Sequence, residues 1–285
     1  MKNALYASYL EIWKQGLVCA GFSPRLPDRG TRYWLEQLER ILPARAGSFL
    51  DIGAGGGRLS LLLGREWGSG IALEVQVDAQ VWAAIQEHYP VLLREGLLQK
   101  TMDELVGTMA FDVVLLSEVF EHIPPIDVPQ FLRTLHALLA DEGTLFLTTP
   151  NVVVQGPAEK SSMWHERQLY GHHKHYALSE LKSIFEKHGF AVQSYCFECH
   201  TLKRHLYNRC FYAISRLDGR LMASSKVPKR LKFAYRLASA PLIVATSLFF
   251  RLVAAVVYYV EKNWSNEKNC LTIIMSIKKM NRNID

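Results

Sequence analysis

The sequence predicts an α/β fold with a mostly parallel sheet and helices on both of its faces. Two observations predict it. Short apolar runs rich in Val, Leu and Ile alternate with helix-length stretches between residues 48 and 149, and the first of these runs is followed at once by several glycines. This alternation is typical of parallel strands joined by covering helices.

The first five expected strands are separated by three expected helices. We expect strands at residues 48–52, 70–74, 96–100, 111–116 and 143–149, with helices at 58–66, 78–88 and 127–139.

The chain then continues with a helix at 179–188 and a strand at 190–197, joined through Gly189 as a helix C-cap. A last strand is expected at 270–278, after a basic and apolar stretch. We therefore divide the chain into an N-terminal helical cap (1–46, with helices at 3–17 and 31–42), a core (47–199), an insert (200–265), and a last core strand with a tail (266–285).

Composition excludes several classes of protein. The chain has 285 residues, 49% of them hydrophobic, and a net charge of +6, which excludes a disordered or collagen-like chain. Five cysteines fit a reducing compartment better than a disulfide framework. Residues 1–16 lack the apolar run of a signal peptide, so the sequence predicts a cytoplasmic protein.

A glycine-rich loop follows the first expected strand. Asp51 and Ile52 precede Gly53, Ala54, Gly55, Gly56 and Gly57, so that backbone lies open to a ligand beside a helix N-terminus. Arg58 stands where a dinucleotide fingerprint needs its third glycine. Asp51 suits a ligand that carries an ammonium group, and Glu74 at the end of the second strand is placed to accept two ribose hydroxyls.

These residues resemble the class I S-adenosylmethionine-dependent methyltransferases, in the group of the ubiquinone-biosynthesis O-methyltransferases. Four further segments agree with that family. They are Phe111–Val114, the Ser117–Ile123 stretch that is similar to its E-V-x-E-H signature, Gly143–Asn151 with its P-N end, and the helix ending in His188-Gly189-Phe190. The resemblance implies a Rossmann-like sheet of seven strands with the last strand antiparallel.

The resemblance also implies a cofactor, S-adenosyl-L-methionine, and the residues that bind it. Thr101 stands where the family usually has an aspartate for the adenine amine, so Met102 is expected to pack on the adenine. The expected cofactor residues are Asp51, Gly53, Ala54, Gly55, Gly57, Glu74, Val75, Met102, Ser117 and Glu118.

Methyl transfer to a hydroxyl needs a base, and histidines supply the candidates. We expect either His122 or His175 to be the catalytic base, and Asn151, Trp164 and His172 to contact the acceptor. Residues 165–175 contain four histidines, but we interpret them as a polar loop that faces the acceptor and expect no metal site.

The insert at 200–265 is basic and apolar at once. Between Cys199 and Val260 there are eleven Lys or Arg residues and one acid, Asp218. Leu206, Cys210, Ile214, Leu217 and Leu221 recur at helical spacing, and Arg251 is the only charged residue in 241–260. We expect a helical hairpin or monotopic helix pair on an anionic membrane surface, and no nucleic acid partner. A buried helical subdomain or a dimer interface stays open as an alternative for this stretch.

The sequence therefore predicts a membrane-associated methyltransferase at the inner face of the membrane, acting on an oxygen of a lipid-like or lipid-linked acceptor. Three alternatives stay open. In the first, the acceptor is a soluble small molecule or sugar and the insert is a lid. In the second, the protein is a non-catalytic membrane adaptor. In the third, it methylates other proteins. The sequence leaves the oligomeric state open.

Overall fold

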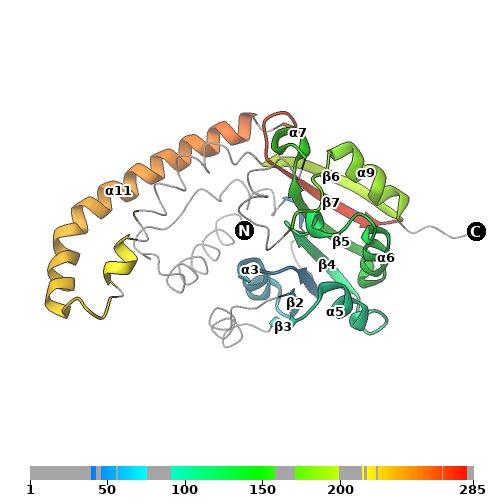
Figure 1. The fold of residues 1–285 in the computed structure, drawn as a ribbon, viewed down its shortest axis with the longest axis horizontal. Coiled ribbons are helices and arrows are strands. Elements are labelled where there is room, and N and C mark those ends of the chain that lie inside the picture. Colours follow the sequence, from blue (N-terminus) through cyan, green and yellow to red (C-terminus); the bar gives the residue numbers. More distant parts are fainter. Residues whose placement is uncertain are drawn as a thin grey trace, which may run out of the picture. The chain divides into compact units, whose positions relative to one another are not determined.

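The computed structural model describes residues 40–42, 46–55, 57–75, 91–157, 171–198, 214, 217–222, 224–264 and 266–280. The chain divides into two compact units (Figure 1). One unit comprises Gln37–Cys199 and Ser265–Asp285, and the other comprises Met1–Glu36 and His200–Trp264. We describe each unit by itself.

The first unit is built on a seven-stranded sheet in the order β3-β2-β1-β4-β5-β7-β6. The pairs from β3 to β5 are parallel, and β7 is antiparallel to both β5 and β6. The predicted fold class is therefore confirmed. The strands are β1 (Phe49–Ile52), β2 (Gly70–Glu74), β3 (Val91–Glu95), β4 (Phe111–Ser117), β5 (Leu139–Pro150), β6 (Phe190–Glu198) and β7 (Thr272–Lys279).

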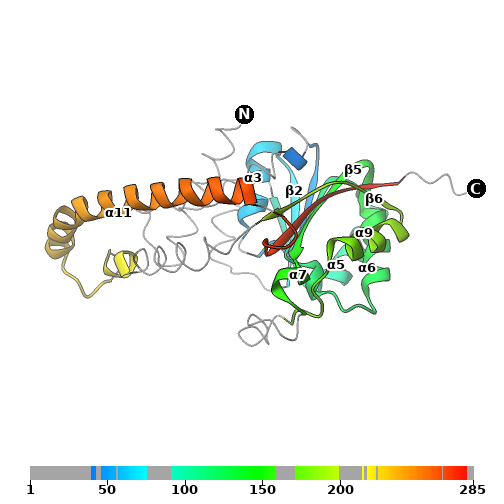
Figure 2. The same ribbon diagram turned by 90° about the horizontal axis from the view of Figure 1, so that it is seen from above.

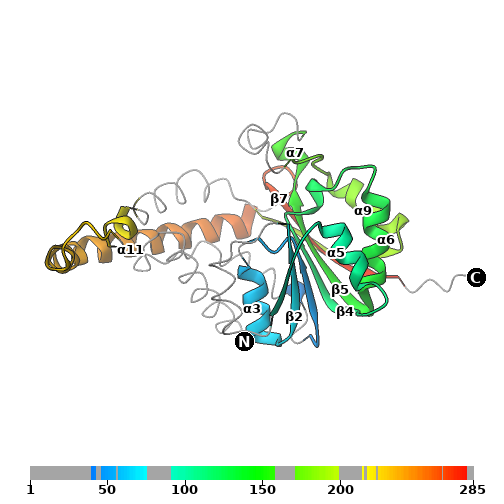
Figure 3. The same cartoon turned by 60° about the horizontal axis from the view of Figure 1, so that its bottom comes forward.

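Helices cover both faces of this sheet. Figure 3 shows α3 (Arg58–Trp67) on one face, with α5 (Leu98–Leu105) and α6 (Val128–Leu138) on the other, the side that also carries α9 (Leu178–Lys187). All four residues of the central strand β1 are buried, because both of its faces are covered. The short elements η1 (Phe120–His122) and α7 (Val152–Gln155) follow β4 and β5.

The predicted third strand is wrong. Residues 96–100 contain the start of α5, and the strand β3 lies earlier, at Val91–Glu95. Thr101, Met102 and Leu105 are the buried residues of α5. Positions 98, 102 and 105 repeat at the three- and four-residue steps of one helix face, and this period outweighs the short apolar run at its start.

Most other predicted elements are confirmed to within a few residues. The fifth strand is longer than predicted, since β5 begins at Leu139. The expected helix at 78–88 and the N-terminal helix at 3–17 lie outside the described residues, as does nearly all of the expected helix at 31–42.

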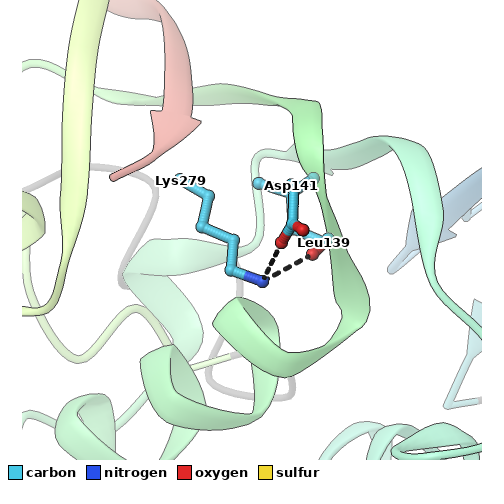
Figure 4. A network of polar contacts seen from close by, with 3 residues as sticks. All are labelled: Leu139, Asp141 and Lys279. Carbon is cyan, nitrogen blue, oxygen red and sulfur yellow. Dashed lines mark hydrogen bonds and ion pairs between the residues drawn. The ribbon is translucent and has the colours of Figure 1, made fainter. Parts of the chain in front are cut away.

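Two lysines at the C-terminal end of β7 attach this last strand to β5. Lys279 donates to the Asp141 carboxylate over 3.0 Å and to the backbone oxygen of Leu139 over 3.5 Å (Figure 4). Lys278 pairs with Glu142 over 3.6 Å. These ion pairs lie where the end of β7 is next to the first part of β5, so they support the antiparallel register of the two strands.

The two described cysteines differ. Cys270, just before β7, is buried and disulfide-bonded. Cys196 on β6 is a free thiol, and burial raises its pKa to about 12.

The second unit contains α11 (Lys229–Trp264), a helix of 36 residues that Figure 2 shows as one continuous coil. The predicted apolar stretch at 241–260 lies inside it, and so does Pro241. Of the expected basic helix from 204 to 221, only residues 214 and 217–221 are described. In the part of the chain that the structure describes, no helix combines the length and the apolar composition of a transmembrane span.

Candidate active site

The glycine-rich loop follows β1 and is held against the end of β2. The backbone N–H groups of Gly53 and Ala54 both donate to the Leu73 carbonyl, over 2.8 and 2.9 Å. Gly53 has a φ of 70°, and a Cβ there would lie 2.5 Å from Cγ2 of Val119. Only glycine fits this position, and the segment after β4 therefore packs directly on the loop.

Asp51 lies under the loop and is almost fully buried. Its Oδ2 accepts a hydrogen bond of 2.5 Å from the hydroxyl of Ser60 on α3. Burial raises the pKa of Asp51 to about 6, the charge of Glu74 adds to the rise, and the Ser60 hydrogen bond opposes it. The carboxyl group is thus poised to change its charge near neutral pH.

Glu74 ends β2 and turns its carboxylate toward the glycine loop. Oε2 accepts from the backbone N–H of Gly55 over 2.5 Å, and Oε1 accepts from the N–H of Val75 over 2.7 Å. Val75 itself is about half exposed. Two backbone donors therefore fix the orientation of both carboxylate oxygens at the carboxyl edge of the sheet, where open α/β sheets bind ligands.

The segment after β4 has a strained backbone. Glu118 has a φ of 57°, and it is the only non-glycine residue with positive φ in the described part of the chain. Its N–H donates to the Thr148 carbonyl over 3.0 Å, and the hydroxyl of Ser117 lies 3.3 Å from the hydroxyl of Thr148. Backbone conformations of this kind cost about 1–3 kcal/mol and occur often at functional sites.

A buried carboxylate follows in η1. Glu121 is fully buried, and its Oε2 accepts from the hydroxyl of Thr149 over 3.0 Å. Its backbone carbonyl accepts from the N–H groups of His173 and Lys174, over 2.8 and 3.3 Å. These contacts attach the loop before α9 to the end of β4.

That loop brings histidines from two distant segments together. The rings of His122 and His172 are perpendicular, with centroids 4.6 Å apart. Nδ1 of His172 lies 2.9 Å from Nε2 of His175, and Nδ1 of His175 lies 2.9 Å from the Gly156 carbonyl oxygen. His172 and His175 are both buried.

Glu121, His122 and His172 each offer one atom that could ligate a metal ion, and these three atoms lie within 4.8 Å of one another. The three side chains together could therefore hold a metal ion. The sequence predicted no such cluster. His172 is 50 positions after His122, and the attachment of its loop to the Glu121 carbonyl helps to bring the two together. The many histidines in 165–175 were the available signal.

Three further residues were predicted to contact the cofactor or the acceptor. Met102 is fully buried in the hydrophobic core. The side chain of Asn151 donates to the Glu267 and Cys270 carbonyls and accepts from the Val153 N–H, so it holds the chain before β7 in place. Trp164 lies outside the described residues.

Residues 28–195 match a family model described as a methyltransferase domain. The chain belongs to this methyltransferase family. The match covers more than half of the chain and contains β1–β5, the glycine loop and the histidine cluster. The family resemblance and the fold that the sequence predicted are therefore confirmed.

Two curated relatives are ubiquinone biosynthesis O-methyltransferases. The chain is 32% identical over 166 residues to the mitochondrial protein of Bos taurus. This alignment covers 53% of the chain and 43% of the bovine protein. It is 31% identical over 176 residues to the protein of Methylobacterium nodulans, covering 58% of this chain and 68% of that protein. The methyltransferase thus spans less than half the length of its bovine relative.

Solved structures share the fold. One is a SAM-dependent methyltransferase from Archaeoglobus fulgidus, with a TM-score of 0.50 and 15% identity, covering 86% of this chain and 90% of that one. Another is the 1,6-didemethyltoxoflavin-N1-methyltransferase of Burkholderia thailandensis, solved with S-adenosylhomocysteine bound. Its TM-score is 0.52 at 15% identity, covering 89% of this chain and 80% of that one.

Proposed function

We propose that the protein is an S-adenosylmethionine-dependent methyltransferase that methylates an oxygen of a small lipid-like acceptor at a membrane surface. The observation that carries the cofactor assignment is the carboxylate of Glu74. Its two oxygens are oriented by the Gly55 and Val75 N–H groups, beside a loop whose glycines leave backbone accessible. Two adjacent ribose hydroxyls are donors that match two oriented oxygens.

The chain's own residues fit the rest of this cofactor. Asp51 would interact with the ammonium group of its methionine end, and the backbone of the loop would contact that end closely. S-adenosylmethionine, when bound, supplies an electrophilic methyl group. The residues proposed to bind it are Asp51, Gly53, Ala54, Gly55, Gly57, Glu74, Val75, Met102, Ser117 and Glu118.

The acceptor side of the site contains the histidines. Val119 packs on Gly53, and η1, which contains Glu121 and His122, begins at the next residue. A hydroxyl that becomes methylated loses its proton, and an imidazole is a suitable acceptor for it near neutral pH. Both curated relatives described above carry the name of an O-methyltransferase, which supports oxygen as the methylated atom.

The helix α11 supports a membrane surface as the place of reaction. Leu248, Leu252 and Tyr259 lie at helical spacing and are 56%, 65% and 70% exposed. Lys229, Arg230 and Arg236 are exposed on its first three turns. A helix with an apolar side and a cluster of basic residues binds the headgroup region of anionic membranes. We propose a peripheral or monotopic protein at the inner, cytoplasmic face of a membrane.

The cofactor assignment predicts a pH dependence. An ammonium group binds the ionised form of Asp51, whose pKa is raised to about 6, so binding lowers that pKa and releases a proton. We expect the affinity for S-adenosylhomocysteine to be constant above this pKa. Below it, affinity should fall by up to about tenfold per pH unit.

Isothermal titration calorimetry at several pH values measures this dependence. The isosteric variant Asp51→Asn should bind S-adenosylhomocysteine weakly and lose the pH dependence. Equal affinity of the wild type on both sides of its Asp51 pKa would refute the role of Asp51 in binding the ammonium group.

A further inference from the structure

Ser60 is a fully buried polar residue in the first turn of α3. Leu59 and Leu62, close to it on the same helix, are also buried. A hydroxyl in such surroundings needs a hydrogen-bond partner, because it loses its contacts with water on folding. Serines inside helices often bond to a carbonyl of the preceding turn. Ser60 has its partner on the sheet instead.

That partner is the carboxyl group of Asp51. The Ser60 hydroxyl donates to Oδ2 over 2.5 Å, and neither residue is more than 2% exposed. Asp51 lies in β1, where it is in register with Ala72 of β2 and Leu115 of β4. An ionised carboxylate accepts hydrogen bonds and donates none, so a hydroxyl is a partner that stabilises its charged form.

This hydrogen bond connects the two sides of the glycine-rich loop. Asp51 stands two residues before Gly53, and Ser60 stands three residues after Gly57. Each of the two side chains is carried by a regular element, β1 or α3. The carboxyl group below the loop is therefore held in one orientation by elements on both sides of the loop.

The surroundings of Asp51 disfavour its negative charge, and Ser60 counteracts them. Burial and the charge of Glu74 on β2 raise the pKa of Asp51, whereas the hydroxyl and the backbone N–H of Ser60 lower it. The residue in register on β4 is apolar. Arg65 and Glu66 of α3 are exposed and lie at least five residues beyond Ser60. Within the described part of the chain, both contributions that lower this pKa therefore come from Ser60.

We propose that Ser60 is a positioning residue for S-adenosylmethionine, whose hydroxyl keeps the Asp51 carboxylate ionised and oriented for the ammonium group of the cofactor. The proposal rests on the proposed function, in which Asp51 binds that ammonium group. Because the hydroxyl of Ser60 is fully buried, it acts through Asp51. Without it, more of Asp51 would be protonated near neutral pH, and a neutral carboxyl group attracts a cation only weakly.

The first test measures the ionisation of Asp51 in the protein without cofactor. The ¹³C signals of the aspartate carboxyl groups are followed against pH, and comparison with Asp51→Asn identifies the signal of Asp51. Ser60→Ala removes the hydroxyl but keeps the backbone N–H. We expect it to move the midpoint of the Asp51 titration upward by about one pH unit. An unchanged midpoint would overturn the proposal.

The second test measures the binding of S-adenosylhomocysteine by calorimetry, from about pH 5 to about pH 8.5. Affinity should follow the ionised fraction of Asp51. We therefore expect Ser60→Ala to bind about tenfold more weakly than the wild type below the wild-type midpoint, and about equally at the highest pH. If Ser60 only attached α3 to β1, the loss would be the same at every pH, and this result would overturn the proposal.

Conservative variants separate the hydroxyl from the volume of the side chain. Ser60→Thr keeps the hydroxyl, so its titration midpoint should equal that of the wild type. Ser60→Cys has a similar volume and only a weak donor, so its midpoint should lie between those of the wild type and Ser60→Ala. Circular dichroism checks that each variant is folded. A Ser60→Thr midpoint as high as that of Ser60→Ala would contradict the role of the hydroxyl.

Thr134 on α6 provides a matched control. It is buried, and its hydroxyl donates to the Asp103 carboxylate over 2.9 Å. Thr134→Ala therefore removes the same kind of hydrogen bond from a different pair of elements. We expect the pH dependence of its binding to be that of the wild type. The same midpoint shift in Thr134→Ala as in Ser60→Ala would show a general effect of lost hydroxyls and overturn the proposal.

The wild type separates this proposal from the proposed function. If the wild type bound no S-adenosylhomocysteine, the proposed function would fail and the proposal with it. If the wild type bound it with the expected pH dependence and Ser60→Ala kept the wild-type midpoint, only the role of Ser60 would fail.

Discussion

Replacing Glu74 with alanine is expected to weaken the binding of S-adenosylhomocysteine about 100-fold. The carboxylate orients two oxygens toward the glycine loop by accepting from Gly55 and Val75. Two hydrogen bonds from a ribose to a charged acceptor contribute about 3 kcal/mol or more, and each 1.4 kcal/mol is about tenfold in affinity. Isothermal titration calorimetry measures the loss.

Glu95 provides a matched control for this substitution. It stands in register with Glu74 on the neighbouring strand β3 and is exposed. Glu95→Ala removes the same charge from the same edge of the sheet but leaves the glycine loop intact. We expect its affinity to equal that of the wild type. Equal affinities of Glu74→Ala and Glu95→Ala would contradict the cofactor site.

The exposed face of α11 is expected to determine vesicle binding. Substituting Leu248, Leu252 and Tyr259 together with glutamine should weaken binding to phosphatidylglycerol-containing vesicles about 100-fold. Each partly inserted side chain contributes about 1 kcal/mol through its buried apolar area. Glutamine is a good helix former, so α11 itself should persist, which circular dichroism can check. Vesicle co-sedimentation measures the binding.

Two further variants separate the contributions. Replacing Lys229, Arg230 and Arg236 with glutamine should remove the preference for anionic over neutral phosphatidylcholine vesicles, since each base contributes about 1 kcal/mol near an anionic surface. Glutamine at Leu97, Met109 and Ile126, which are exposed apolar residues of the other unit, should change nothing. If the wild type did not sediment with either vesicle, the membrane proposal would be wrong.

Short apolar runs and the turn residues between them predicted every strand of the sheet except the third. The run Phe49–Ile52 followed by glycines identified β1 and its loop, because few local structures tolerate such a sequence. The third strand was missed because Leu97 and Leu98 look like a short strand, whereas the buried face of α5 is defined only together with Met102 and Leu105.

The sequence predicts the proximity of the proposed cofactor residues better than it predicts the proximity of the histidines in the cluster. Asp51, Gly53 and Glu74 lie at fixed places relative to two consecutive strands, so their proximity follows from the strand order. His172 reaches Glu121 and His122 through backbone hydrogen bonds of an irregular loop, which no periodicity encodes.

The measurement that tests the central claim most directly follows the methyl group. The purified protein, methyl-labelled S-adenosylmethionine and a whole-cell extract of its host are mixed, and the products are partitioned between organic solvent and water. We predict label in the organic phase with the wild type and none with Glu74→Ala. Label confined to the aqueous small molecules or to protein would contradict a lipid-like acceptor, and no transfer to any fraction would contradict the methyltransferase activity.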